Sequence, residues 1–222
     1  MKNNKGFTLI EIAMAMMIIA LIIGAVMVGR NLVDSSRNVK VVKEFTNYQQ
    51  AVSTFYDIHT ALPGDMATAS SVWGGTNGNG NEQIEEDFAL SGGGESTHAW
   101  NHLDFEGLIE NVQSHSFGPT GLEYYIGNIV TSVVDSGVYY FDYVASFGNF
   151  MELGAFAVAL TAPNAAVINP AEAFFIDNKL DDGLSTQGRV RSNLAGCRNG
   201  NEYLLTSEQN VCTLRMKLET DF

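Results

Sequence analysis

The chain has 222 residues, a length that predicts one or two domains. Apolar residues make up 45% of it and charged residues 17%, below the ~25% of an average soluble protein. The 12 basic and 25 acidic residues give a formal net charge of -13, so a broad basic face that binds nucleic acid is not expected. The sequence has neither a collagen period nor a charge-rich heptad array, and its apolar content argues against wholesale disorder.

A long apolar run near the N-terminus predicts a membrane-spanning helix. Residues 12–29 carry no charged side chain, and the apolar character begins near residue 7. About 23 helical residues span roughly 34 Å, enough for the ~30 Å core of a bilayer. We expect this span over about residues 7–29 rather than a buried core helix, because every face of the segment is apolar. A secretory signal peptide is the main alternative, but the run exceeds its ~7–15 apolar residues and no clear cleavage site follows.

Glu11 lies inside this apolar run and requires a partner. A charged residue at the middle of a membrane helix costs ~2.5–3.5 kcal/mol on insertion scales, and less near an end. No lysine or arginine lies one helical turn away. A cut between Gly6 and Phe7 would place a new ammonium four residues before Glu11, where the two charges can meet within one chain or between chains. The alternative is a glutamate that simply reaches the membrane surface.

Residues 5–11 read KGFTLIE. This segment closely resembles the processing motif of type IV prepilins and of type II secretion pseudopilins, and the short leader with Lys2 and Lys5 also fits. The resemblance implies that a prepilin peptidase cuts after Gly6 and methylates the amine of Phe7. It further implies that Glu11 pairs with the N-terminus of a neighbouring subunit during assembly.

The helix is expected to continue beyond the membrane, over residues 7–60. In its second half the apolar residues step by four and three, which predicts a face that packs on the protein's own head, with a local coiled coil as the alternative: Val41, Phe45, Tyr48, Val52 and Phe55. Pro63 and Gly64 stop the helix. Gly24 and Gly29 are points where it can bend, at ~1 kcal/mol each relative to alanine.

The rest of the chain predicts an antiparallel sheet with two helices. The glycine-rich stretches between residues 64 and 96 indicate flexible connections without a nucleotide cradle. A helix is expected over 98–110, and a second begins at Pro170 with an Asn169 cap and ends near Gly183. Strands are expected over residues 124–134, 138–146, 156–161 and 212–218, the last with one buried face and one solvent-facing face. The fold class is α+β, a long N-terminal helix packed on an antiparallel sheet, as in pilins.

Three aspartates crowd the end of the second helix: Asp177, Asp181 and Asp182. Carboxylates at a helix C-terminus oppose the helix dipole, so another group should offset them. Calcium, which takes oxygen ligands, is one candidate, and calcium sites near the C-terminus occur in some pseudopilins, although the spacing is not that of an EF-hand. Hydrogen bonds or ion pairs are the favoured explanation, with three basic candidates: Lys179, Arg189 and Arg191.

The two cysteines, Cys197 and Cys212, form a disulfide if the head is exported, and the closed loop would stabilise the fold by ~3 kcal/mol. A zinc site is disfavoured, because the four histidines show no ligand spacing. A C-terminal disulfide loop over residues 197–212 resembles a region of type IV pilins that is often exposed on the fibre. This favours a pilin over a pseudopilin.

No catalytic motif is evident, so we do not expect an enzyme. His98 and His102 lack the adjacent glutamate of a metalloprotease, and a Gly-x-Ser-x-Gly motif is absent. The sequence therefore divides into a cleaved leader (1–6), the long helix (7–60) and an exported head (61–222).

The resemblance implies a structural subunit of a type IV pilus-like filament, without a cofactor other than the candidate calcium. Its partners would be other copies of itself and related pilins, the prepilin peptidase, an inner-membrane assembly platform and the lipid bilayer. The precursor would cross the inner membrane once, with its N-terminus cytoplasmic and its head periplasmic, because the short positive leader resembles a signal's n-region. The subunit would then enter an extracellular pilus or a periplasmic pseudopilus. The alternatives are a type II secretion pseudopilin and a non-polymerising, single-pass membrane-anchored binding protein.

Overall fold

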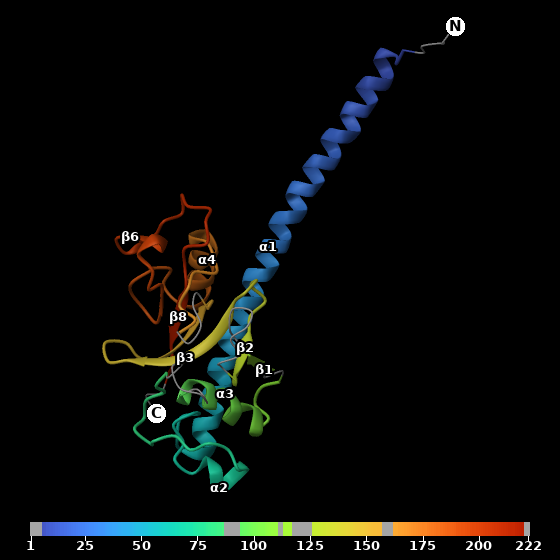
Figure 1. Cartoon of the computed structure of the whole chain (residues 1–222). Coiled ribbons are helices and arrows are strands. Elements are labelled where there is room, and N and C mark those ends of the chain that lie inside the picture. Colours follow the sequence, from blue (N-terminus) through green and yellow to red (C-terminus); the bar gives the residue numbers. More distant parts are fainter. Residues whose placement is uncertain (1–5, 87–93, 111–112, 117–125, 157–161, 220–222) are drawn as a thin grey trace. The chain divides into compact units, whose positions relative to one another are not determined.

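Figure 1 shows a computed structural model of the chain, which describes residues 6–86, 94–110, 113–116, 126–156 and 162–219. The chain divides into two units, Met1–Val39 and Lys40–Phe222. Helix α1 (Leu9–His59, 51 residues) contributes to both. The predicted helix over residues 7–60 is therefore confirmed to within two residues at each end.

In the first unit, α1 is apolar on all sides over residues 12–29, and its large apolar side chains are exposed. The helix passes Gly24 and Gly29 without a break in its assignment. Among the described residues, one helix is long and apolar enough to cross a membrane by length and composition, and it is α1. An all-round apolar surface of this length requires lipid or other apolar helices around it.

The second unit, which we call the head, is built on an antiparallel sheet. Among the described residues six strands form it, in the order β1-β2-β3-β4-β8-β5. The strands are β1 (Gln113–Ser116), β2 (Ile126–Thr131), β3 (Val138–Val144), β4 (Gly148–Gly154), β8 (Leu214–Lys217) and β5 (Val190–Arg191). The last strand in the sequence, β8, therefore pairs between β4 and the edge strand β5, so the C-terminal segment is part of the sheet's interior.

The part of α1 within the head supplies much of the core. The predicted seam is confirmed, because Val41, Phe45, Val52 and Phe55 are fully buried and Tyr48 is half-buried. Ring contacts attach this face to β3 and to the helix α3 described below: the rings of Phe45 and Tyr139 lie 5.2 Å apart, as do those of Tyr48 and Trp100. Such edge-to-face pairs add to the energy of burial.

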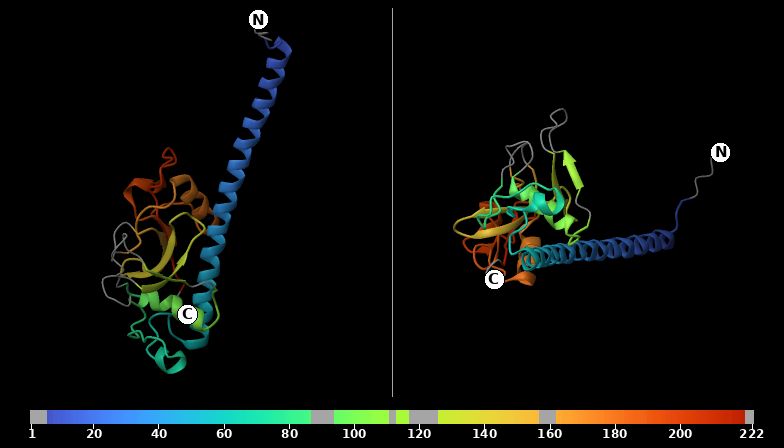
Figure 2. Two further views of the ribbon diagram at one scale, coloured as in Figure 1. Left: turned by 45° about the vertical axis from the view of Figure 1, so that its right-hand side comes forward. Right: turned by 90° about the horizontal axis from the view of Figure 1, so that it is seen from below.

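The remaining elements lie at the two ends of the head. Helices α2 (Ala69–Trp73) and α3 (Glu95–Phe105) lie at one end, and helix α4 (Pro170–Leu180) with strand β6 (Arg198–Asn199) lies at the other (Figures 1 and 2). Strand β6 pairs with β7 (Glu202–Tyr203) in a small hairpin that follows the short 3-10 helix η1 (Ala195–Cys197). The cap of α4 is as predicted: Asn169 and Glu172 form a capping box and Pro170 occupies the first helical position.

One predicted helix differs from the structure, and one predicted strand cannot be compared with it. The helix expected over 98–110 is α3, which begins at Glu95 and ends at Phe105. Gly107, in the left-handed conformation with φ +70°, ends the helix. The Gly107 N–H donates to the Asp104 carbonyl oxygen and the Leu108 N–H to that of Leu103, which together form a Schellman motif. The strand expected over 156–161 lies outside the described residues after its first position, and residues 124–125 lie outside them too.

The glycine-rich segment after residue 64 is held more firmly than its composition predicts. The buried carboxylate of Asp65 accepts hydrogen bonds from the backbone N–H groups of Gly80, Asn81 and Glu82, at 2.6–3.0 Å. Gly64 itself has φ +88°, and an added Cβ would meet the Glu95 carbonyl oxygen at 2.3 Å. The described part of this segment is therefore an ordered loop wrapped around one aspartate.

The two faces of the sheet have different compositions. One face packs on α1 and α3 through apolar residues, among them Tyr139, Phe141, Met151, Leu214 and Met216. The opposite face carries a polar row, described below. The predicted alternation in the last strand is confirmed, but its second face is not solvent-facing: Thr213 is fully buried and the Arg215 side chain is 15% exposed.

Candidate functional site

The N-terminal site begins where α1 begins. Thr8 precedes the first helical residue, and its backbone N–H and its hydroxyl both donate to Oε2 of Glu11, at 2.7 and 2.8 Å. The Glu11 N–H approaches the Thr8 hydroxyl oxygen at 3.3 Å in return. This is a capping box, in which a threonine and a glutamate three residues later satisfy the unpaired N–H groups at a helix start.

The capping box directs the Glu11 carboxylate toward the N-terminal end of the helix. Gly6 and Phe7 lie just before that end, outside the helix and exposed, and Met1 to Lys5 lie outside the described residues. In the intact chain, Phe7 is joined to Gly6 by an ordinary peptide bond. A cut there would put an ammonium on the residue adjacent to the Thr8 N–H that Glu11 already binds. Sequence reasoning missed Thr8, although the spacing Thr-x-x-Glu signals this cap.

The three aspartates predicted at the end of α4 do converge. One carboxylate oxygen from each of Asp177, Asp181 and Asp182 lies within 4.8 Å of the others. Their partners are backbone N–H groups: Gly183 donates to Asp177, Leu184 to Asp182, and both Arg189 and Val190 to Asp181. Hydrogen bonds therefore offset the helix end, but they come from backbone N–H groups and not from the side chains of the predicted basic partners, whereas calcium stays a prediction.

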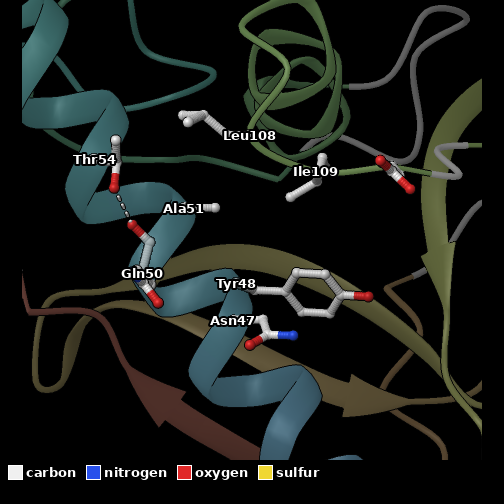
Figure 3. Close-up of a pocket in the computed structure, with 8 residues that line it drawn as sticks. Asn47, Tyr48, Gln50, Ala51, Thr54, Leu108 and Ile109 are labelled. Carbon is white, nitrogen blue, oxygen red and sulfur yellow. Dashed lines mark hydrogen bonds between the residues drawn. The ribbon is translucent and has the colours of Figure 1, made fainter.

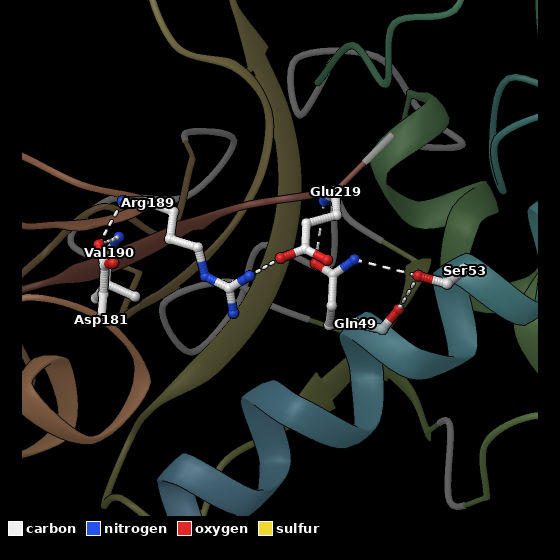
Figure 4. Close-up of polar contacts among 6 residues, drawn as sticks. All are labelled: Gln49, Ser53, Asp181, Arg189, Val190 and Glu219. Atoms are coloured by element: carbon white, nitrogen blue, oxygen red, sulfur yellow. Dashed lines mark hydrogen bonds and ion pairs between the residues drawn. The ribbon is translucent and has the colours of Figure 1, made fainter. Parts of the chain in front are cut away.

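The basic side chains proposed as partners of these aspartates point elsewhere. The Arg189 guanidinium forms an ion pair with Glu219, while only the Arg189 backbone N–H reaches Asp181 (Figure 4). Arg191 donates to the Gly188 carbonyl oxygen at 2.8 Å, and Lys179 lies over the Phe175 ring at 5.8 Å. The prediction of ion pairs was wrong, because the turn after α4 offers backbone donors at closer range.

The loop over residues 181–191 has a glycine where the carboxylate needs space. Gly188 has φ +65°, and a Cβ added there would lie 1.9 Å from Oδ2 of Asp181.

The buried Asp177 carboxylate also accepts from the Tyr203 hydroxyl at 2.8 Å. Burial raises the pKa of the Asp177 carboxyl to about 7, although the hydrogen bonds from Tyr203 and Gly183 oppose that increase. Tyr203 lies far along the chain, and no sequence signal linked it to Asp177.

The disulfide between Cys197 and Cys212 is present, as predicted, with the two Cα atoms 4.8 Å apart. Both cysteines are fully buried. Cys212 also pairs by backbone hydrogen bonds with Ile168, just before α4. The bridge therefore connects the hairpin β6–β7 to the start of β8 and to the segment that leads into α4.

A shallow groove of about 470 Å³ runs along the head part of α1, between Asn47, Tyr48, Ala51 and the segment at Leu108 and Ile109 (Figure 3). Among the described lining residues its wall is neutral apart from Glu110, and none is a histidine, cysteine or lysine.

The two histidines weighed as catalytic candidates lie on α3, and His102 is fully buried there, where its Nδ1 accepts from the Gly64 N–H at 2.9 Å. That contact gives His102 a structural role in holding the loop after α1.

Comparison with known proteins places the N-terminal site in a family. A search of curated proteins and a search of solved structures each returned no match. A family model described as the prokaryotic N-terminal methylation motif matches residues 1–27, the stretch that holds Gly6, Phe7 and Glu11. That family is structural rather than catalytic, and its motif marks precursors that are membrane-anchored. The chain thus carries, over residues 1–27, the prepilin-type N-terminal methylation motif of type IV pilins.

Proposed function

We propose that this chain is a structural subunit of a type IV pilus-like filament and has no enzymatic activity. The observation that carries the proposal is the set Gly6, Phe7 and Glu11 ahead of an apolar helix, within the matched residues 1–27. A prepilin peptidase cuts after Gly6 and the amine of Phe7 is methylated. Until assembly the subunit remains in the inner membrane, with a cytoplasmic N-terminus and a periplasmic head.

Assembly exchanges one apolar environment for another. The exposed apolar side chains of residues 9–29 contact lipid in the precursor and the equivalent helices of neighbouring copies in the filament. Apolar burial is therefore largely conserved on extraction from the membrane. The assembly platform then has to supply mainly the direction and order of addition.

Glu11 sets the register of this exchange. Within an apolar bundle an unpaired carboxylate and an unpaired ammonium are each costly, so the arrangement that joins Glu11 to the Phe7 amine of a neighbour is preferred over axial slips. The Thr8 cap supports this role, because it already orients the carboxylate toward the end of the helix where the amine forms. The pair acts through specificity more than through net stability.

The loop closed by Cys197 and Cys212 lies at the end of the head distant from α2 and α3. It favours a pilus subunit over a type II secretion pseudopilin, because it resembles the C-terminal disulfide loop of type IV pilins. Pilus motor and retraction genes beside the coding sequence would support the first, and secretion genes would support the second.

Mass spectrometry of purified surface filaments tests the proposal. We expect a mature chain that begins at Phe7, carries one methyl group on its amine and is present in the filament. An intact Met1 on a protein that remains in the membrane would contradict the proposal and favour a membrane-anchored binding protein that does not polymerise.

A further inference from the structure

A polar row crosses the face of the sheet opposite to α1. Register pairs place Tyr140, Glu152, Arg215 and Arg191 side by side on strands β3, β4, β8 and β5. Glu152 is fully buried, and its Oε2 accepts from the Tyr140 hydroxyl at 3.0 Å and from Nη2 of Arg215 at 2.9 Å. The charge of Arg215 is therefore offset on one side of the row.

On its other side, Arg215 faces a second cation. Arg191 is its direct cross-strand partner in the β5–β8 pair. Like charges directly opposite each other on neighbouring strands are destabilising. Within the described part of the chain, no carboxylate forms an ion pair with Arg191. The row thus ends in a positive charge that has no ion-pair partner among the described residues.

A cavity of about 180 Å³ lies at this end of the row. Three arginines line it (Arg191, Arg198 and Arg215), together with polar side chains and Phe147, and none of the described lining residues is acidic. This is unusual in a chain that has 25 acidic and 12 basic residues. We call this cavity the arginine pocket.

The arginines are held in place before any ligand arrives. The Arg191 guanidinium lies over the Phe147 ring at 4.7 Å and that of Arg215 over the Phe150 ring at 4.5 Å, with the two rings 5.9 Å apart. A guanidinium that packs on an aromatic face keeps its N–H edges available for hydrogen bonds. Arg198 directly follows Cys197, so the disulfide fixes its backbone, and its side chain has no ion-pair partner among the residues that the structure describes.

Two donors at the pocket lack an acceptor within the described structure. The hydroxyl of Ser192, a residue that is 3% exposed and lines the pocket, has no hydrogen-bond partner, and neither has the buried Nε of Arg215. Buried donors without partners are costly. An oxyanion can accept from both the hydroxyl and the guanidinium groups, and the forked geometry of arginine matches carboxylate, sulfate and phosphate oxygens.

We propose that the arginine pocket binds one oxyanion group, a carboxylate, sulfate or phosphate, through Arg191, Arg198 and Ser192. Arg215 contributes charge and its unpaired Nε, while Glu152 holds it in position. The volume fits one such group, either a free anion or the end of a larger ligand, because a water occupies roughly 30 Å³ in the liquid. Ligand selection is local, because the net charge of -13 repels anions from the rest of the surface.

The test uses the full-length chain in detergent with its disulfide oxidised. Sodium sulfate, sodium phosphate and sodium acetate are titrated by calorimetry at constant ionic strength, with chloride as the balancing anion. We expect saturable binding of at least one of them. Preference for sulfate or phosphate over acetate would identify a tetrahedral ligand, and the reverse preference a carboxylate.

The variants Arg191→Gln and Arg198→Gln test the pocket itself. Each should bind the anion about tenfold or more weakly, while Lys179→Gln, which removes the same charge outside the pocket, should bind as the wild type does. Arg215 is not the residue to change, because its loss leaves Glu152 buried without its cation. Melting temperatures without added oxyanion verify folding, and Arg191→Gln should be at least as stable as the wild type because it removes the facing charge.

Two results would overturn the proposal. One is the lack of saturable binding of all three anions to the folded wild type. The other is equal binding by the wild type and both pocket variants, which would show general stabilisation by excluded salts instead of a site.

Discussion

The two parts of α1 differ in how many apolar residues they contain and in where those residues lie. In residues 9–29 the apolar side chains occur on every face and are exposed, and Glu11 is the one charged residue. From Val41 to Phe55 they follow one face, which is buried in the head. The first half therefore depends on surroundings that another molecule must supply, whereas the second half is stabilised by its own chain.

The two regions also differ in whether their interacting groups are close in the sequence or come from distant segments. In the N-terminal half, the proposed function depends on residues only a few positions apart, as in the Thr8–Glu11 cap. In the head, the groups that act together come from distant segments: Asp177 meets Tyr203, and Glu152 meets Arg215. Changes in the first region should therefore alter assembly without altering the fold, and changes in the second should alter the stability of the head.

The largest expected effect comes from Glu11→Ala. This variant should be processed after Gly6, because the cut lies outside the helix, yet its filament yield should decrease about tenfold or more, since no carboxylate remains to pair with the Phe7 amine. Sheared filaments quantified by immunoblot, together with the N-terminal sequence of the cellular protein, give both readouts. Wild-type yield would contradict the register role.

Thr8→Ala is the matched control, because it removes the hydroxyl of the cap but keeps the carboxylate. Loss of an N-cap side chain costs ~1 kcal/mol of helix stability. We expect a filament yield close to that of the wild type. A decrease as large as that of Glu11→Ala would show that Glu11 acts only by capping the helix within its own chain.

Reduction of the disulfide should have the next largest effect, confined to the head. Cys197 and Cys212 are the only two cysteines, so a reductant acts on this one bridge. Opening a loop of this size should lower the free energy of unfolding by ~3 kcal/mol, because the unfolded chain regains conformational freedom. Denaturant unfolding followed by fluorescence of the buried Trp100 measures it. An unchanged denaturation midpoint, or a loss of filaments without any loss of head stability, would contradict the expectation that the disulfide acts on the stability of the head.

Sequence reasoning succeeded where a signal is periodic or local. The α1 seam, the Asn169 cap and the last strand all follow from residue spacing, and the structure has them. It placed the end of α3 five residues too late, because the Schellman motif at Gly107 was not recognised. It also took the loop after Gly64 as flexible, although Asp65 holds the loop through backbone N–H groups that carry no side-chain signature.

The partners of the charged residues in the head could not be predicted from the sequence either, because they also depend on contacts that carry no local signal. An alternating strand with Arg215 on its polar face normally indicates a solvent-facing side. The register of β4 against β8 determines that this side chain instead meets Glu152, and long-range register is not encoded in either strand alone. Basic side chains were likewise assigned to the aspartates after α4, whereas turn geometry supplies backbone donors.

A smaller effect is expected in the pH dependence of head stability. Burial raises the pKa of Asp177 to about 7 and that of Asp142 to about 6, both above their unfolded value of 3.8. The folded state therefore binds these protons more tightly, and stability should decrease as the pH rises from about 4 to 7. In Asp177→Asn the decrease should be smaller, so its melting temperature relative to the wild type should increase by a few degrees, on the order of 3 °C, between pH 5 and pH 8.

The measurement is made in EDTA, with Asp104→Asn as the control because that carboxylate is exposed. The control should follow the wild type at every pH. A parallel pH dependence in Asp177→Asn and the wild type would contradict the assignment. The remaining slope in the variant should come from the other carboxyls whose pKa burial raises, Asp142 and Glu95.

The smallest effect is expected from calcium, and it tests whether the aspartates after α4 behave as part of the head's own fold. Backbone N–H groups and Tyr203 already bind these carboxylates, so replacing EDTA with millimolar calcium should change the melting temperature by less than about 2 °C. A metal present at 100 times its dissociation constant would instead stabilise the fold by ~2.7 kcal/mol, several degrees for a head of this size. An increase of that size with calcium but not magnesium, lost in Asp182→Asn, would establish a metal site. The end of α4 would then resemble the first half of α1 in needing a partner from outside the chain.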